Sequence, residues 1–292
     1  MVSWMRPQIK YIAWVAERWM YKVLRKTAFI GLPLCLLAIV IYTYSKSPTH
    51  DRNWKVEHGV LPEAEINGNE LTVKNIRTFT YTPTGEIETP AHQDRKYDIE
   101  GLRELWYGIS HFHPYGLAHT FLSFGFEDGE YLSVSIEARQ EKGEVYHPVT
   151  GLMRNYELIF VLADERDVIG VRTHHRDEQV YLYRLEVKPD NIRRMLLRMI
   201  QRVNSLSKKA EFYNTLTDNC TTSILKLVED FSWTDIYMDY RVLLPGYSDQ
   251  VAYEMGFLNA DTPFSELKKR AWLNPARTQI NDPLFSKKIR GF

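Results

Sequence analysis

The sequence has little cysteine and no excess of charge of either sign. Only Cys35 and Cys220 occur among 292 residues, which excludes a disulfide-rich scaffold. Lys and Arg together number 37, as do Asp and Glu, so no overall positive field favours nucleic acid. The chain also lacks a Walker loop, a dinucleotide-binding fingerprint, a G-x-S-x-G elbow and an H-E-x-x-H motif. Its ordinary apolar and charged fractions predict a globular protein.

The charge is unevenly distributed along the chain. Residues 1–26 carry six Lys and Arg against one Glu, whereas residues 27–45 carry no charged side chain. That uncharged stretch would span about 28 Å as a helix, close to a bilayer hydrocarbon core of about 30 Å. We expect an uncleaved transmembrane helix at 27–45, because the flank after it is aromatic and basic rather than a cleavage site. The alternatives are a buried core helix and a signal peptide.

The basic segment predicts the orientation of the chain. The positive-inside rule keeps residues 1–26 in the cytoplasm and exports the chain after residue 45. Apolar residues of 1–26 fall on one helical stripe, which predicts a basic amphipathic helix in the membrane surface, with an imperfect first span as the alternative. The exported part then comprises a main domain, 46–261, and a C-terminal extension, 262–292.

Cys220 is the strongest candidate for chemistry. Cys35 lies in the membrane segment, so no disulfide joins the two and Cys220 is a lone thiol in an exported domain. Asp218 or Asn219 is a favourable N-cap that puts Cys220 in the first turn of a helix. The unpaired amides and the dipole of that turn favour a thiolate and can hold an oxyanion. We predict a nucleophile; a buried structural cysteine is the alternative.

His119 is the predicted base. Among nine histidines, only His119 begins a convincing strand, 119–126, which a second strand follows at 130–139. A three-residue loop with Gly129 in the left-handed conformation pairs His119 with Glu137. Glu137 would then orient the imidazole as the third member of a triad. A two-residue turn is the alternative, and it moves Glu137 away from His119.

A zinc site is the rival interpretation of the histidine-rich segment. His111, His113 and His119 have a spacing that can build one, but Pro114 and Gly116 interrupt the segment. We expect neither a metal nor another cofactor, and we expect His111 and His113 to support the substrate or the catalytic residues instead.

The remaining pattern predicts an α+β domain. Strands are expected at 71–81, 156–163, 167–173 and 179–187. Helices are expected at 97–109 and from about residue 190, ahead of the Cys220 helix.

Four long segments, 53–81, 110–139, 151–173 and 211–222, resemble the Lnb N-terminal periplasmic domain family. The resemblance covers roughly residues 53–260. It implies a circularly permuted papain-like domain of the NlpC and lecithin:retinol acyltransferase type, with the histidine before the cysteine. It also implies a periplasmic catalytic domain in which Cys220, His119 and Glu137 are nucleophile, base and orienting acid. Together with the one span expected at 27–45, this predicts a single-pass protein of the bacterial inner membrane.

The activity implied by the resemblance is acyl transfer. A fatty acyl chain would pass from a membrane phospholipid through a Cys220 thioester to the N-terminal amine of a lipidated protein, with the bilayer as the meeting place. The rings of Trp106, Phe112, Tyr115 and Phe121 are expected to shape an acyl groove or to pack in the core. Further residues expected to bind substrate or support the triad are Ser135, Arg139, Tyr213, Asn214, Asn219 and Thr221.

Two other functions remain open. One is a tethered cysteine peptidase or amidase acting on peptidoglycan, and the other is a non-enzymatic envelope scaffold. An acyltransferase should have an apolar groove beside Cys220, whereas a peptidase should have an open polar cleft. A scaffold should have Cys220 buried away from His119.

The topology is testable with reporters fused after Phe292. Alkaline phosphatase, which is active only outside the cytoplasm, should be active there, and green fluorescent protein exported through the same route should be dark. The reason is the charge asymmetry across residues 27–45. The opposite result would mean that residues 1–26 also span the membrane or that the orientation is reversed.

Overall fold

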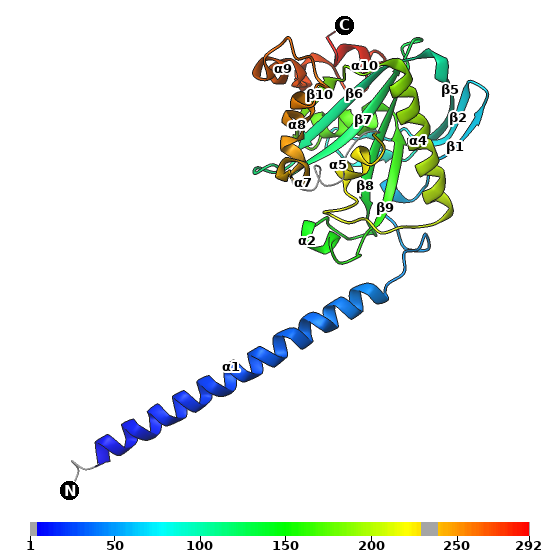
Figure 1. Ribbon diagram of the computed structural model, residues 1–292. Coiled ribbons are helices and arrows are strands. Elements are labelled where there is room, and N and C mark those ends of the chain that lie inside the picture. Colours follow the sequence, from blue (N-terminus) through cyan, green and yellow to red (C-terminus); the bar gives the residue numbers. More distant parts are fainter. Residues whose placement is uncertain (1–4, 229–238, 292) are drawn as a thin grey trace. The chain divides into compact units, whose positions relative to one another are not determined.

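The computed structural model describes residues 5–228 and 239–291. The chain divides into two compact units, Met1–Ser47 and Pro48–Phe292 (Figure 1). The first unit is built around α1 (Met5–Ser45), which continues from the basic segment into the apolar one without a break. Its part Ala16–Ser45 is long and apolar enough to cross a membrane. The amphipathic and transmembrane segments expected from the sequence are therefore one helix.

The second unit is an α+β domain built on an eight-stranded sheet, with strand order β1-β2-β9-β8-β7-β6-β10 and β5 paired to β2. All pairs are antiparallel except β2 with β9. The strands are β1 (Glu63–Asn67), β2 (Glu70–Arg77), β5 (His92–Asp98), β6 (Leu102–His111), β7 (Ala118–Phe126), β8 (Tyr131–Arg139), β9 (Glu157–Ala163) and β10 (Gln179–Arg184), and a separate hairpin joins β3 (Thr80–Tyr81) to β4 (Ile87–Thr89).

Short helices and turns connect the strands, and among the described elements of this second unit only α4 is longer than eight residues. The described elements are η1 (Val56–His58), η2 (Ile99–Gly101), α2 (Pro148–Gly151), η3 (Arg166–Gly170), α3 (Val171–His174), α4 (Pro189–Lys208), α5 (Cys220–Leu225), α7 (Tyr240–Leu243), η4 (Pro245–Tyr247), α8 (Ser248–Glu254), α9 (Phe264–Ala271), η5 (Pro275–Arg277) and α10 (Phe285–Lys288).

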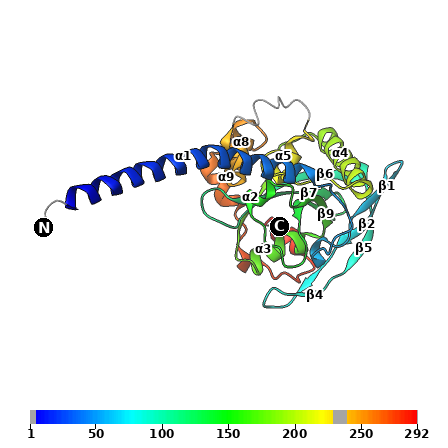
Figure 2. The same ribbon diagram turned by 90° about the horizontal axis from the view of Figure 1, so that it is seen from below.

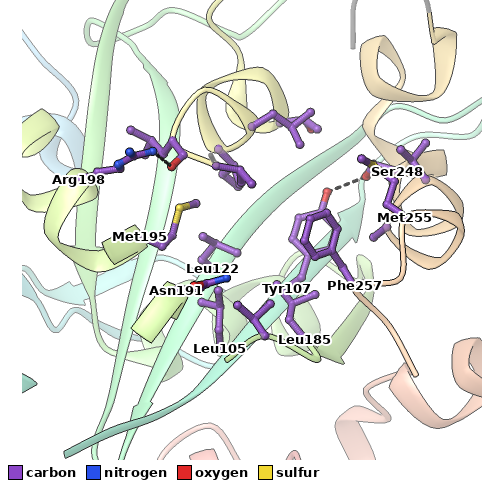
Figure 3. A pocket seen from close by; sticks show the side chains of 18 of the residues that line it. Leu105, Tyr107, Leu122, Leu185, Asn191, Met195, Arg198, Ser248, Met255 and Phe257 are labelled. Atoms are coloured by element: carbon purple, nitrogen blue, oxygen red, sulfur yellow. Dashed lines mark hydrogen bonds between the residues drawn. The ribbon is translucent and has the colours of Figure 1, made fainter. Parts of the chain in front are cut away.

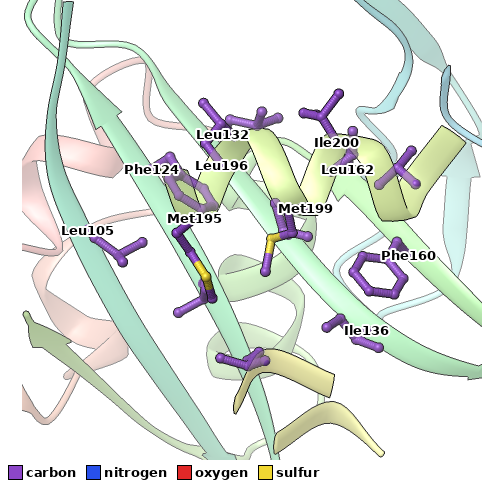
Figure 4. Packing of buried hydrophobic residues seen from close by; sticks show 14 of the residues in the cluster. Leu105, Phe124, Leu132, Ile136, Phe160, Leu162, Met195, Leu196, Met199 and Ile200 are labelled. Atoms are coloured by element: carbon purple, nitrogen blue, oxygen red, sulfur yellow. The ribbon is translucent and has the colours of Figure 1, made fainter. Parts of the chain in front are cut away.

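The sheet is covered on both faces. On one face α4 crosses the strands, and its Met195, Leu196 and Met199 pack on Phe124 and Leu162 (Figure 4). The short helix α5 lies on the same face. On the other face, the turns of η3 and α3 and the helix α10 bury a second apolar cluster; Figure 2 shows α3 across the sheet from α4 and α5. Because a sheet buried on both faces carries apolar side chains on both, its central strands do not alternate cleanly.

That double burial explains one wrong prediction. The segment 97–109 was expected to be a helix, but most of it is strand β6. Trp106 points into one apolar cluster and Tyr107 into the other, so consecutive apolar residues imitate a helical pattern.

The predicted strand at 167–173 is also wrong, since η3 and α3 occupy it. The buried Asp167 carboxylate accepts hydrogen bonds from Arg77 Nε at 2.8 Å and from the Tyr81 hydroxyl at 2.8 Å. These bonds tie the helical turn η3 to β2 and β3.

The hairpin of β7 and β8 has the predicted register. Phe121 pairs with Ser135 and Phe124 with Leu132. Gly129 has a φ of 86°, which a residue with a Cβ rarely adopts. The three-residue loop is therefore confirmed, and Glu137 lies on the His119 face of the sheet.

The C-terminal extension, 262–292, packs within the second unit. Phe285 and Ile289 are buried in the cluster on the α3 face. Arg290 forms two hydrogen bonds to the Glu165 carboxylate, at 2.5 and 2.8 Å, and both side chains are inaccessible to solvent. The Arg290 guanidinium also stacks over the Tyr131 ring at 3.7 Å.

Replacing Arg290 should therefore destabilise the whole domain. In Arg290→Met the Glu165 carboxylate stays buried without its partner, and we expect a loss of about 3–5 kcal/mol in the free energy of unfolding. Urea unfolding of the full chain in detergent, followed by tryptophan fluorescence, measures it. Arg270→Met is the matched control, because the Arg270–Glu266 pair is exposed and should be worth less than about 1 kcal/mol. Equal midpoints for the two variants would contradict the structural role of the extension.

Candidate functional site

Cys220 is the first residue of α5. Asn219 is the N-cap: its Oδ1 accepts from the Thr222 amide at 2.8 Å, and Thr222 Oγ1 accepts from the Asn219 amide at 2.9 Å. This capping box confirms the predicted helix start. It leaves the amides of Cys220 and Thr221 without a hydrogen-bond partner among the described residues. Donors at a helix start are suited to an anion.

The surroundings of Cys220 are rich in hydroxyl groups. The Thr221 hydroxyl lies 4.0 Å from the Cys220 sulfur and 3.1 Å from the Thr120 hydroxyl on β7. Burial raises the pKa of Tyr213 well above its ordinary value, and negative charge on the nearby Cys220 adds to this. The Tyr213 hydroxyl is 3.2 Å from that of Tyr146.

A mostly apolar cavity of about 370 Å³ opens beside the start of α5 (Figure 3). Its volume lies in the range of small-molecule pockets, about 300–1,000 Å³. Residues of the sheet, α4, α5 and α8 line it, among them Leu122, Met195, Thr221, Ile224, Met255 and Phe257. The cavity therefore adjoins Thr221, the residue directly after Cys220.

The structure does not bring His119 to Cys220. Thr120 faces α5, and successive residues of a strand point to opposite faces of the sheet. His119 accordingly points to the other face, where its ring lies near Phe121 of the second cluster. The predicted hydrogen bond between the His119 imidazole and the Cys220 sulfur is therefore wrong in this structure, and the catalytic roles of His119 and Glu137 stay predictions.

On that other face, His119 belongs to a chain of polar side chains. Its Nε2 is 2.7 Å from Ser135 Oγ, which donates to Glu137 Oε1 at 2.6 Å. Since Ser135 has one proton and gives it to the carboxylate, His119 Nε2 is the donor to Ser135. His58 Nδ1 accepts from the Gln140 amide, so His58 Nε2 donates to Glu137 Oε2 at 3.1 Å.

The charges of this chain are shifted by burial and by neighbouring arginines. Burial, followed by the positive charge of Arg172, lowers the pKa of His119 to about 3. Burial alone would raise the pKa of Glu137, but the hydrogen bond from His58 and the charges of Arg77 and Arg172 hold it well below its ordinary value. The resting state is a neutral His119 beside an ionised Glu137.

The three histidines of the zinc interpretation do not converge. His111, at the end of β6, lies on the Tyr107 face of the sheet, and its Nε2 is buried without a hydrogen bond. His113 lies in an exposed loop, with Nδ1 2.9 Å from the Pro114 carbonyl oxygen. Within the described ranges, no group of three or more His, Cys, Asp and Glu could hold a metal ion.

Other predicted site residues have local structural partners. Arg139 donates to the His58 carbonyl oxygen at 2.9 Å and stacks over Trp54 at 4.1 Å. Asn214 Oδ1 accepts from the amides of Leu216 and Thr217 and shapes the turn before α5.

The four rings were expected to shape an acyl groove or to pack in the core. Trp106 and Phe121 pack in the core of the α3 face, whereas Phe112 and Tyr115 are exposed. The apolar cavity lies on the α5 face instead.

Two residues of the cavity were missed by sequence reasoning. Tyr107 on β6 and Ser248 at the start of α8 line the cavity, and their hydroxyls are 2.7 Å apart. Tyr107 lay in the segment expected to be a helix. Had residues 102–111 been predicted as a strand, the alternation of side chains would have put Tyr107 on the same face of the sheet as His111.

The fold and the site together define an α+β domain that follows an apolar N-terminal helix and carries one thiol at a helix start beside an apolar cavity. Residues 88–246, more than half of the chain, match the model of the family described as the Lnb N-terminal periplasmic domain. The chain belongs to this family, as the resemblance predicted, and it is a periplasmic domain of an Lnb-type protein. No curated protein and no solved structure matches it.

The neutral His119, whose side chain is 16% exposed, predicts a pH dependence of stability. Its folded pKa of about 3 lies below the unfolded value of about 6.5, so the unfolded chain binds the proton first and stability falls as pH drops through this window. Between pH 7.5 and 5.0 the parent should lose about 2 kcal/mol more than His119→Gln in urea unfolding.

The matched control is His113→Gln, which removes an exposed histidine and should keep the pH dependence of the parent. A His119→Gln variant that loses as much stability as the parent over the same interval would show that His119 is not held neutral.

Proposed function

We propose that the chain is a membrane-anchored thiol acyltransferase in which Cys220 carries the acyl group. The observation that carries this proposal is the position of Cys220, at a capped helix start next to Thr221, which lines an apolar cavity. An acyl chain needs an apolar site, and an acyl-transferring thiol needs donors for the oxyanion of its carbonyl.

The proposed reaction has two halves. The Cys220 thiolate attacks the ester carbonyl of a phospholipid, and collapse of the oxyanion releases the lysophospholipid alcohol and leaves a thioester. The N-terminal α-amine of a lipidated protein then attacks the thioester carbonyl, which forms an amide and returns the thiol. In this scheme the amides of Cys220 and Thr221, at the capped start of α5, stabilise both oxyanions.

The apolar N-terminal helix supports the proposal that the acyl donor and the acceptor are lipids. Ala16–Ser45 is long and apolar enough to cross a bilayer, and the family is a periplasmic one. An enzyme held at the membrane meets donor and acceptor lipids at a high effective concentration. We infer a single span in the bacterial inner membrane, with the N-terminus cytoplasmic and the domain periplasmic.

We further propose the circularly permuted papain-like architecture implied by the resemblance. The order of elements supports it, since the strand that bears His119 precedes the helix that bears Cys220, and α5 packs on the sheet. The separation of His119 from Cys220 speaks against the complete triad, so the proposal rests on Cys220 as nucleophile and gives His119 no direct part in the attack.

A non-enzymatic scaffold is the second candidate, because Cys220 is only 6% exposed and lies away from His119. The peptidase alternative gains no support, since the cavity beside α5 is apolar rather than an open polar cleft.

Intact-mass spectrometry distinguishes these functions. The full chain, purified in detergent and incubated with phospholipid micelles, should gain the mass of one fatty acyl group, and neutral hydroxylamine should remove it as a thioester. Cys220→Ser should gain no hydroxylamine-labile mass, because its hydroxyl cannot form a thioester. Cys35→Ala is the matched control and should be acylated like the parent. Absence of any adduct in the parent would overturn the proposal in favour of a scaffold.

A further inference from the structure

Two pairs of hydroxyl groups lie at the cavity beside α5. The Thr221 hydroxyl, 4.0 Å from the Cys220 sulfur, is 3.1 Å from that of Thr120. The Tyr107 phenol is 2.7 Å from Ser248 Oγ (Figure 3). Thr221, Tyr107 and Ser248 all line the same cavity, so the phenol of Tyr107 and the helix that bears Cys220 border one space.

The direction of these hydrogen bonds makes Tyr107 a donor. Ser248 Oγ donates its only proton to the Pro245 carbonyl oxygen, at 2.5 Å, so it accepts from Tyr107. Burial raises the pKa of Tyr107, and negative charge on the nearby Cys220 adds to this, so the phenol keeps its proton. Rotation about the C–O bond is enough to turn that proton from Ser248 toward another acceptor.

Three other tyrosines near the site are less suited to donate a hydrogen bond into the cavity. The hydroxyls of Tyr146 and Tyr213 pair with each other, and neither residue lines the cavity. The Tyr183 hydroxyl donates to the buried Asp249 carboxylate at 2.8 Å. Tyr107 lines the cavity together with Thr221, whose hydroxyl is 4.0 Å from the Cys220 sulfur.

We propose that Tyr107 is a catalytic residue whose phenol donates a hydrogen bond to the oxyanion formed when Cys220 attacks an acyl carbonyl. This inference rests on the proposed function. In the step, a C–S bond forms, the carbonyl π pair moves to oxygen, no bond to the leaving group breaks, and Tyr107 keeps its proton. Ser248 holds the phenol in place until the oxyanion competes for it.

The test compares acylation with alkylation of the same sulfur. A thiolate that attacks p-nitrophenyl butyrate passes through an oxyanion, whereas one that attacks iodoacetamide reacts at a saturated carbon and forms none. Tyr107→Phe should slow the release of p-nitrophenol by Cys220 about 100-fold, the usual effect of losing one oxyanion donor. Its alkylation rate should stay within about threefold of the parent. A merely structural role of Tyr107 would lower both rates together.

Tyr183→Phe is the matched control, because it removes a buried phenol from the neighbouring strand β10 and should change neither rate. Ser248→Ala keeps the Tyr107 phenol but removes the hydroxyl that accepts its hydrogen bond, and it should slow acylation several-fold. This variant replaces Tyr107→Phe in the test if Tyr107→Phe does not fold. Parent-like acylation by Tyr107→Phe, or equal loss of both reactions, would overturn the inference. A parent that reacts with the nitrophenyl ester but never with phospholipid would refute the proposed function alone.

Discussion

The alternation of side chains along β7 is the constraint on which the site depends. Thr120 faces α5 and His119 faces α3, because neighbouring residues of a strand point to opposite sides of a sheet. This separates a face of apolar side chains and hydroxyls, which holds Cys220, from a face on which charged groups are interleaved with the second core. A change of register by one residue would exchange the two sets, so the Gly129 turn that fixes the register also fixes the site.

The charged face is a structural layer. Glu137, Asp167 and Glu165 are each bonded to an arginine, and the arginines come from β2, α3 and the C-terminal extension. Buried ions are tolerated when their partners are present and are strongly destabilising when one is removed. These pairs therefore tie segments far apart in the chain to the back of β7 and β8.

The features that could be predicted from the sequence are those fixed by nearby residues. The β7–β8 register follows from one glycine, and the start of α5 follows from Asn219 and Thr222. The face on which α5 packs is set by contacts such as Thr120–Thr221, which are 101 residues apart, and no local pattern encodes it. The Tyr107–Ser248 contact could not be predicted for the same reason, because the two residues are 141 positions apart in the sequence. Strand β6 was missed because both of its faces are buried.

The separation of the two layers bears on the chemistry proposed for Cys220. The described groups beside it are dipoles, namely the helix-start amides and the Thr221 hydroxyl, rather than a histidine that takes up the proton. Dipoles fixed before the reaction stabilise negative charge as it moves from sulfur to a carbonyl oxygen. An apolar cavity at the same place favours an acyl chain over water. A thioester formed there would be shielded from hydrolysis until an amine arrives, which is the property that distinguishes a transferase from a hydrolase.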